Sequence, residues 1–200
     1  NQKHLIPQIL ANSLSNLRSE SKSILEDPTA FTDILDKGIS RFPGRTRAIV
    51  KVQEGCIGGC TYCIVPLARG PSRSIPVEEI LAEVQRLKGA GNPEIAITGT
   101  RLGLFGLDLK PKTTFLTLLK ELVHWSRGQD RQIMFRISSI DPEDITEELL
   151  SFVLSEPLIC QHFHISAQSG SSSVLARMGR KYQPGFISKM ILEIRKQNPK

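Results

Sequence analysis

The sequence predicts an α/β fold in which short parallel strands alternate with helices, as in part of a (β/α) barrel. From Thr46 onward, short apolar runs alternate with segments of helical spacing, and such repeats imply parallel strands with right-handed crossovers. The runs are short and apolar, as expected when helices cover one face and a barrel interior the other. Polar residues or glycines follow each run, at the strand ends where such folds bind ligands. We therefore expect about four barrel strands within residues 45–200.

The first half of this region contains two expected strands with a helix between them. Ala48–Val52 is a short β-branched run, and Ile95–Thr98 is the next strand. The helix is expected to begin at Pro76, because proline suits the first turn and carboxylates follow at the positive end of the helix dipole. Its apolar residues form one stripe at helical spacing: Val77, Ile80, Leu81, Val84 and Leu87.

The second half repeats the pattern. Phe115–Val123 is expected to be a helix, Ile133–Ile137 a third strand and Phe163–Ile165 a fourth. Asp141-Pro142-Glu143 predicts a helix start, because a capping carboxylate precedes a proline at the first helical position. Two helical segments close the chain, and the last has apolar residues at helical spacing: Ile187, Met190, Ile191 and Ile194.

The residues before Thr46 have a different composition. Residues 11–44 are polar and rich in Ser, Asp and Lys, which predicts a linker with one short helix around Thr29–Lys37. The chain begins with Asn rather than Met, and we expect a segment of a longer protein. No apolar run approaches the roughly 20 residues needed to cross a bilayer. The net charge of +6 is compatible with a polyanionic partner such as a nucleic acid.

The most informative motif is CxxxCxxC, formed by Cys56, Cys60 and Cys63. Three thiolates on one short loop can bind three irons of a [4Fe–4S] cube and leave the fourth iron open. A cube that only transfers electrons normally has four cysteine ligands. An open iron can bind a small molecule, and S-adenosylmethionine (SAM) is the one that generates radicals in this way. The spacing therefore favours a catalytic cluster.

Other interpretations of the cysteines are weaker. A structural zinc site needs four ligands, but no second cysteine pair follows, His124 is isolated, and His162 and His164 lie about a hundred residues downstream. Four cysteines are too few for a secreted disulfide framework, and reduced, clustered cysteines predict a cytoplasmic setting. Cys160 opens an apolar run and is expected to be a small buried residue.

Polar residues at the predicted strand ends are candidates for cofactor binding. They follow strands two, three and four and are Thr98, Gly99, Ser138, Ser139, Gln168 and Ser169. In α/β folds the carboxyl ends of parallel strands meet at one mouth, where ligands bind. Each residue also has an ordinary explanation, such as turn formation at Gly99 or a loop serine before a cap. The case for a site depends on their convergence.

Several ordered motifs resemble those of the radical-SAM methylthiotransferase family. The matching stretches are Val52–Cys56, Cys60–Pro66, Ala68–Ser74, Arg136–Pro142, Gln168–Ser171, Val174–Leu175, Arg177–Met178 and Arg180–Tyr182. The stretches Gly70–Ser74 and Ile137–Pro142 are most similar to the branch that acts on threonylcarbamoyladenosine-37 of tRNA. The branches that modify isopentenyladenosine-37, or an aspartate of a ribosomal protein, are the alternatives.

The resemblance implies a catalytic core that binds a [4Fe–4S] cluster and SAM, with tRNA as substrate and flavodoxin or ferredoxin as an electron donor. It implies that residues 1–44 end an N-terminal methylthiotransferase domain and that residues 45–200 hold four of six barrel strands. A second [4Fe–4S] cluster is then expected only in the full-length protein. A non-catalytic iron–sulfur scaffold that binds RNA remains an alternative of another class.

The resemblance also suggests roles for residues around the cysteines. Tyr62, between two ligands, is expected to pack beside the cube and the SAM adenine, or else against the barrel. Arg69 and Arg73 suit a phosphate or the SAM carboxylate, or else a solvated basic loop. A second basic group is expected at tRNA or on a helix face: Arg177, Arg180 and Lys181. The chain departs from the family at Gly58-Gly59, usually Asn and an aromatic residue.

Two further departures follow downstream. Ser166-Ala167 replaces a usual Pro-Leu, and Gly179 replaces a common Asn.

Overall fold

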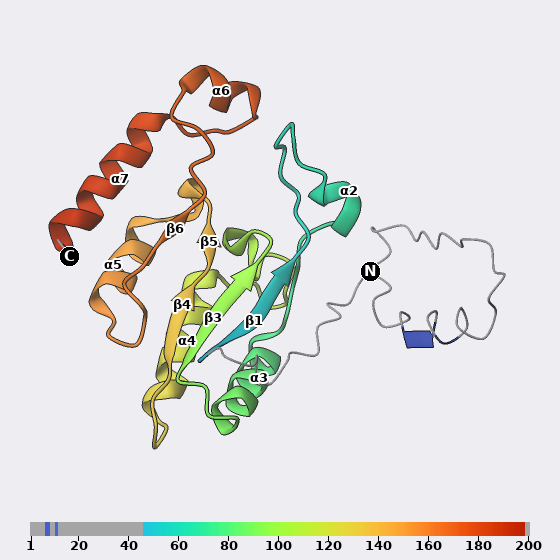
Figure 1. The fold of residues 1–200 in the computed structure, drawn as a ribbon, viewed down its shortest axis with the longest axis vertical. Coiled ribbons are helices and arrows are strands. Elements are labelled where there is room, and N and C mark those ends of the chain that lie inside the picture. Colours follow the sequence, from blue (N-terminus) through green and yellow to red (C-terminus); the bar gives the residue numbers. More distant parts are fainter. Residues whose placement is uncertain (1–6, 9–10, 12–45, 199–200) are drawn as a thin grey trace.

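A computed structural model describes residues 7–8, 11 and 46–198 (Figure 1). The predicted linker, with its helix around Thr29–Lys37, and nearly all of the predicted N-terminal segment 1–44 lie outside the described residues. From Arg47 onward, strands and helices alternate as predicted. None of the helices among residues 7–8, 11 and 46–198 is long and apolar enough to span a membrane.

Three parallel strands form the main sheet: β1 (Arg47–Glu54), β3 (Glu94–Gly99) and β4 (Met134–Ile137). A two-residue strand, β2 (Arg73–Ser74), adds an antiparallel edge beside β1, so the order is β2-β1-β3-β4. Each parallel strand covers its predicted run with small shifts at the ends. The carboxyl ends of β1 and β3 point toward the same end of the molecule (Figure 1).

Helices α3 (Val77–Gly89) and α4 (Phe115–Arg127) cover one face of this sheet (Figure 1). The Thr114 side chain begins α4 by accepting a hydrogen bond from the backbone N–H of Thr117. The main hydrophobic core lies between these two helices and the face of the sheet that they cover. Its fully buried members include Val52, Val84, Leu87, Ile95, Ile97, Leu118, Leu119, Leu122, Phe135 and Ile137.

The opposite face of the sheet is more polar than the predicted barrel interior. Ile49 and Met134 are each 41% exposed on this side. The Glu94 carboxylate accepts from the Nε of Arg47 at 2.6 Å and from the Nε of Arg136 at 2.5 Å. Burial alone would raise the pKa of Glu94, but the two guanidinium groups lower it below its usual value. Charged residues can occupy these positions because no helix among the described residues covers this face.

The predicted fourth strand is reduced to β6 (His164–Ile165), which pairs in parallel with β5 (Ser139–Ile140). These two strands form a separate small sheet. Ser138 separates β5 from β4, yet its N–H still donates to the carbonyl oxygen of Ile97 at 3.1 Å. The small sheet therefore continues the curved, mostly parallel half-barrel that the sequence predicts.

The helix predicted at Asp141-Pro142-Glu143 begins later in the chain. Pro142–Asp144 forms only a 3-10 turn, η4, and α5 (Glu147–Ser155) begins after Thr146, whose side chain accepts from the N–H of Leu149. The predicted cap was wrong, because the Asp141 carboxylate contacts arginine side chains instead of the turn.

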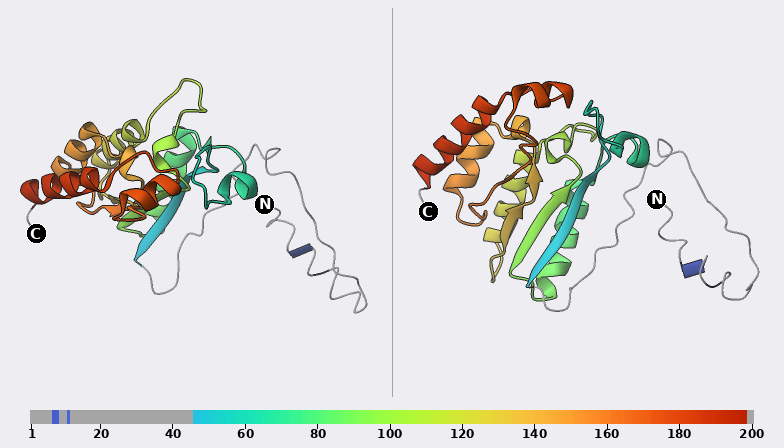
Figure 2. Two further views of the ribbon diagram at one scale, coloured as in Figure 1. Left: turned by 90° about the horizontal axis from the view of Figure 1, so that it is seen from above. Right: turned by 45° about the horizontal axis from the view of Figure 1, so that its top comes forward.

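Two helices end the described chain: α6 (Ser172–Arg177) and α7 (Pro184–Gln197). A second, small hydrophobic core lies at these helices and consists of Leu175, Tyr182 and Ile187. Both views in Figure 2, like Figure 1, show α6 beside the loop that follows β1. The segment after β6 thus reaches back to the end of the first strand.

Candidate functional site

The three predicted cluster ligands lie on the cysteine loop, which we define as residues 55–64, directly after β1. The loop begins at Gly55, whose φ of +76° favours glycine. A Cβ at Gly55 would overlap the carbonyl oxygen of Pro71, so this close approach also requires glycine. The next residue, Cys56, donates its backbone N–H to the carbonyl oxygen of Gly70 at 3.1 Å. The amino end of the loop is therefore held against residues 70–71.

Gln53, which is fully buried, organises the base of the loop. Its Nε2 donates to the carbonyl oxygen of Gly55 at 2.7 Å and to the Oγ of Ser72 at 2.8 Å. Its Oε1 accepts from the backbone N–H of Arg101 at 2.8 Å. One amide group thus joins the end of β1, the cysteine loop and the end of β3.

The predicted anion-binding arginines Arg69 and Arg73 lie on the other side of this base. Arg69 Nη1 is 2.8 Å from the Oε1 of buried Glu54. Arg73 is 8% exposed, and its Nη1 donates to the carbonyl oxygens of Arg69 and Pro71. The Nε and Nη2 of Arg73 are buried and have no hydrogen-bond partner in the described part of the chain. Both residues brace the loop, and contact with SAM or phosphate stays a prediction.

All three predicted ligands are partly buried on the cysteine loop. The Sγ of Cys56 accepts from the backbone N–H of Gly58 at 3.2 Å, and the N–H of Cys63 donates to the carbonyl oxygen of Cys60 at 3.1 Å. Residues 7–8, 11 and 46–198 contain no group of three Cys, His, Asp or Glu side chains that could hold a metal ion. The three thiols are thus neighbours on one loop without surrounding a common point.

The chemistry of this donor set nevertheless fits an iron–sulfur cluster. Three thiols on one partly buried loop can supply thiolates to three irons, and Gly58 already directs an N–H at a sulfur, as around bound clusters. Metal binding commonly completes the arrangement of its ligands. Cys160 is buried, as predicted, and burial raises the pKa of its thiol, which disfavours the thiolate that a metal would bind.

The carboxyl half of the loop packs against the last residue of α6 and the residues that follow it. The backbone N–H of Thr61 donates to the carbonyl oxygen of Met178 at 3.2 Å, and the Thr61 hydroxyl donates to that of Arg177 at 2.7 Å. Arg180 Nη2 donates to the Tyr62 hydroxyl at 2.8 Å, and its guanidinium lies 6.0 Å from the centre of the Tyr62 ring. Hydrogen bonds thus join the cysteine loop to residues more than a hundred positions later in the sequence.

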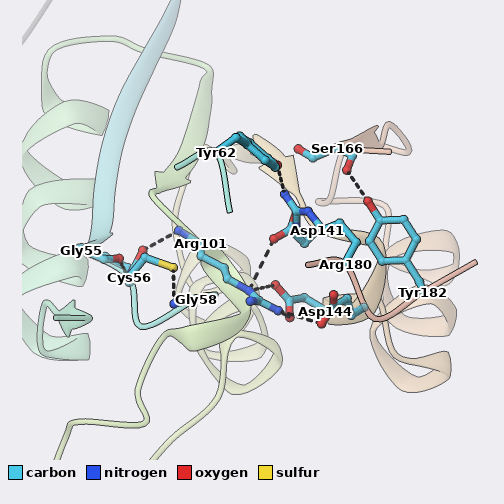
Figure 3. A network of polar contacts seen from close by, with 12 residues as sticks. Gly55, Cys56, Gly58, Tyr62, Arg101, Asp141, Asp144, Ser166, Arg180 and Tyr182 are labelled. Atoms are coloured by element: carbon cyan, nitrogen blue, oxygen red, sulfur yellow. Dashed lines mark hydrogen bonds and ion pairs between the residues drawn. The ribbon is translucent and has the colours of Figure 1, made fainter. Parts of the chain in front are cut away.

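A charged network runs from the end of β3 to this contact (Figure 3). Arg101 Nε and Nη2 each lie 3.0 Å from a carboxylate oxygen of Asp144. The same guanidinium contacts Glu143 at 3.3 Å and Asp141 at 3.5 Å. Asp141 in turn accepts from Arg180 Nη1 at 3.0 Å. The order is Asp144, Arg101, Asp141, Arg180, Tyr62, which ends on the cysteine loop.

Both arginines of this network stay protonated. The hydrogen bonds and charge of Asp144 raise the pKa of Arg101 above its usual value. Burial alone would lower the pKa of Arg180, but the Tyr62 hydroxyl and the Asp141 carboxylate outweigh it and raise that pKa as well. The network therefore pairs two permanently charged guanidinium groups with three carboxylates, and it ends at the cysteine loop.

The sequence did not reveal this network, although it contained a signal. Arg101 comes two residues after β3, and the acidic run Asp141–Asp144 comes directly after β5. Opposite charges after neighbouring parallel strands meet at the same sheet edge. The acidic run had instead suggested a helix start. Gln53 carried no comparable signal, since a glutamine at a strand end is usually exposed.

The predicted cofactor-binding residues lie at the carboxyl ends of β3, β4 and β6. Thr98 and Gly99 end β3, and the position of a Gly99 Cβ lies 3.1 Å from Gln53 Oε1. The hydroxyl of Ser139 lies 3.1 Å from the Nδ1 of His164. Ser138 lies between β4 and β5.

Gln168 and Ser169 follow β6. Gln168 has a φ of 64°, and it is the one non-glycine residue with positive φ in the described part of the chain. Such conformations often occur at functional sites. Among the contacts described, none joins these strand-end residues directly to the cysteine loop, so their role in binding SAM stays a prediction.

The remaining predicted residues differ in accessibility. Tyr62 is 49% exposed, and Arg177 and Lys181 are exposed as well. The Arg180 side chain is only 7% exposed. Of the second basic group, Arg177 and Lys181 are therefore accessible at the surface, whereas the guanidinium of Arg180 is engaged within the protein.

Comparison with known proteins identifies the family. Residues 50–199, three quarters of the chain, match the Radical SAM superfamily. The chain therefore belongs to this superfamily, which agrees with the prediction made from the cysteine motif and the strand pattern. A loop with three cysteines at the end of the first strand is consistent with this assignment.

Curated relatives narrow the comparison. Over 188 residues the chain is 39% identical to the threonylcarbamoyladenosine tRNA methylthiotransferase MtaB of Bacillus subtilis, covering 94% of this chain and 38% of that protein. It is 33% identical over 186 residues to the tRNA-2-methylthio-N(6)-dimethylallyladenosine synthase of Clostridium tetani, covering 93% and 40%. The chain thus spans about two fifths of the length of these relatives. The predicted family resemblance is confirmed.

A solved structure supports the fold. The radical S-adenosylmethionine methyltransferase TsrM from Kitasatospora setae, with bound cobalamin and [4Fe–4S] cluster, aligns with a TM-score of 0.59 at 15% identity, covering 74% of this chain and 28% of that protein. At this identity the likeness concerns the fold alone. The predicted partial barrel is confirmed.

Proposed function

We propose that this chain is the core of a radical-SAM tRNA methylthiotransferase that binds one [4Fe–4S] cluster through Cys56, Cys60 and Cys63. The observation that carries the proposal is the position of these cysteines: they form one partly buried loop at the carboxyl end of β1, in a parallel half-barrel of the Radical SAM superfamily. A loop with three thiols leaves one iron for SAM.

SAM is proposed to bind across the ends of β1, β3, β4 and β6. When bound, the cluster and SAM supply one-electron cleavage of a carbon–sulfur bond and hence a carbon radical that can abstract hydrogen. The chain would position SAM with Gly99, at the end of β3, and with Gln168 and Ser169, which follow β6. Arg73, with two buried nitrogen atoms free to donate, suits the carboxylate of SAM.

The proposed reaction of the whole protein is methylthiolation at C2 of N6-threonylcarbamoyladenosine-37 in tRNA. Four of the relatives at 34–41% identity are named for threonylcarbamoyladenosine. Others, at 31–35%, are named for the dimethylallyladenosine product, which is the alternative substrate branch. Exposed Arg177 and Lys181 are proposed to contact the tRNA backbone, which predicts salt-sensitive binding. We place the reaction in the cytoplasm.

Anaerobic reconstitution with iron and sulfide tests the core proposal. We expect a brown protein with one cubane per chain, and formation of 5′-deoxyadenosine when SAM and a strong reductant are added. Cys63→Ala should lose the cluster, whereas Cys160→Ala, the matched control on the same chain, should keep it. Full iron loading of Cys63→Ala would contradict the ligand assignment. A loaded protein that never cleaves SAM would favour a non-catalytic scaffold.

The substrate is tested on the full-length protein. It should add a methylthio group to tRNA that carries threonylcarbamoyl at adenosine-37, measured as a mass increase of the digested nucleoside. Transfer RNA that carries dimethylallyl at the same position is the matched comparison. Modification of that tRNA in preference to the first would assign the protein to the other branch.

A further inference from the structure

The carboxyl half of the cysteine loop is held by one distant segment, which we call the clasp and define as residues 177–182. Both hydrogen bonds of Thr61 go to backbone carbonyl oxygens of the clasp. The same segment supplies Arg180 to the hydroxyl and ring of Tyr62. The amino half of the loop is held elsewhere, by Gly70. The two halves of the loop thus have separate supports.

The clasp comes unusually close to the loop at Gly179. This residue has a φ of +72°, which favours glycine. A Cβ at Gly179 would lie 2.6 Å from the carbonyl oxygen of Gly59, too close for any other residue without movement of the backbone. Gly59 itself has open space around the position of its own Cβ. The close approach therefore depends on Gly179 in particular.

Arg180 is anchored more firmly than a surface arginine. Its side chain is 7% exposed, its Nη1 pairs with Asp141 at 3.0 Å, and its Nη2 donates to Tyr62 at 2.8 Å. Asp141 is itself held by Arg101, whose guanidinium also contacts Asp144. The guanidinium of Arg180 is therefore fixed against Tyr62, between Cys60 and Cys63 on the cysteine loop.

We propose that the clasp fixes the position of Cys60 and Cys63 relative to Cys56, and that Arg180 is a positioning residue for the cluster assigned above. Its guanidinium would also favour the reduced cluster, because a nearby fixed positive charge stabilises an added electron. This inference rests on the proposed function for the cluster. The contact between the clasp and the cysteine loop is independent of that proposed function.

The first experiment uses the cluster-free 200-residue chain and measures amide hydrogen exchange at Thr61. Gly179→Ala should force the clasp away and speed exchange of this amide about tenfold, as expected for one lost hydrogen bond. Gly59→Ala is the matched control, because it adds the same methyl group on the facing residue in open space. Equal exchange at Thr61 in the two variants would overturn the clasp.

The second experiment concerns Arg180 and the reconstituted cluster. In Arg180→Met we expect about 10- to 100-fold weaker retention of iron against a chelator. We also expect a more negative midpoint potential of the cluster, measured in a redox titration from the electron paramagnetic resonance signal of the reduced cluster. Arg180→Lys keeps the charge and should restore part of the potential. Arg195→Met, which removes the same charge from an exposed position on α7, should match the parent.

The outcomes separate the two proposals. An unchanged potential and iron retention in Arg180→Met would overturn the positioning role while leaving the proposed function intact. A parent chain that takes up no cluster would overturn the proposed function and, with it, the role of Arg180. The exchange comparison at Thr61 would still decide whether the clasp holds the loop.

Discussion

Replacement of Gln53 by leucine is the sharpest test of how the base of the cysteine loop is built. Leucine is similar in size but makes no hydrogen bonds, so the carbonyl oxygen of Gly55 and the backbone N–H of Arg101 both lose their Gln53 partner. Gln53 is fully buried, so water cannot replace the amide. The Ser72 hydroxyl, which accepts from the Nε2 of Gln53, is only partly buried and is left out of the estimate.

The magnitude follows from these two groups. A buried polar group that loses its partner costs about 1–3 kcal/mol, so Gln53→Leu should lower the free energy of unfolding by roughly 2–6 kcal/mol. Urea denaturation of the cluster-free chain, followed by circular dichroism, measures this change. Gln85→Leu on the exposed side of α3 is the matched control and should stay within about 0.5 kcal/mol of the parent.

A second variant separates the two ends of the amide. Gln53→Glu retains an oxygen that can accept from Arg101 but loses the donor to Gly55, and it buries a charge beside Glu54. It should therefore be at least as destabilising as Gln53→Leu. If Gln53→Leu were as stable as Gln85→Leu, the amide would not hold the loop, and the reasoning would be refuted.

Three further changes test other parts of the site. Arg101→Met leaves Asp144 and Glu143 without their cation and should lower the free energy of unfolding by roughly 2–4 kcal/mol, less than for a fully buried pair. Gly55→Ala should cost a similar amount, about 2–4 kcal/mol, from strain at positive φ and overlap with backbone. Arg136 helps to lower the pKa of Glu94, so the ionised carboxylate stabilises the fold above about pH 4.5. Glu94→Gln should therefore cost about 1–2 kcal/mol of the free energy of unfolding at pH 7. This cost should decrease progressively as the pH falls below about 4.5. Urea denaturation measures all three.

Matched controls exist for each of these changes. Arg131→Met removes an exposed arginine, Glu79→Gln an exposed carboxylate, and Gly89→Ala adds a methyl group in open space at the end of α3. Each should change the free energy of unfolding by no more than about 0.5–1 kcal/mol. An Arg101 or Gly55 variant no less stable than its control, or a Glu94 variant whose deficit does not change with pH, would contradict the assigned interaction.

The sequence predicted the main sheet well because its signals are local. Runs such as Ala48–Val52 and Ile95–Thr98 are apolar over several residues, and they became β1 and β3 with only small extensions. The helix start at Asp141 was wrong for a non-local reason. Its carboxylate pairs with Arg101 and Arg180, and each of these residues lies about 40 positions away in the sequence.

The sequence predicted the proposed cluster ligands of the candidate site but not the residues that hold the cysteine loop in place. The cysteine spacing is a local pattern, so the sequence alone gave the residues that we propose to bind the cluster. The clasp depends on contacts between residues about 120 positions apart. Two departures from the family pattern, Gly59 and Gly179, meet in that contact. Read separately in the sequence, neither glycine indicated this contact.

The small core formed by Leu175, Tyr182 and Ile187 has a consequence for heat resistance. It is separate from the main core, so the region that carries the clasp can open locally while the sheet remains folded. On warming, the grip on Cys60 and Cys63 would then be lost before the strands unfold. We expect cluster release at a lower temperature than the loss of circular dichroism, so that three side chains set the working temperature of the proposed enzyme.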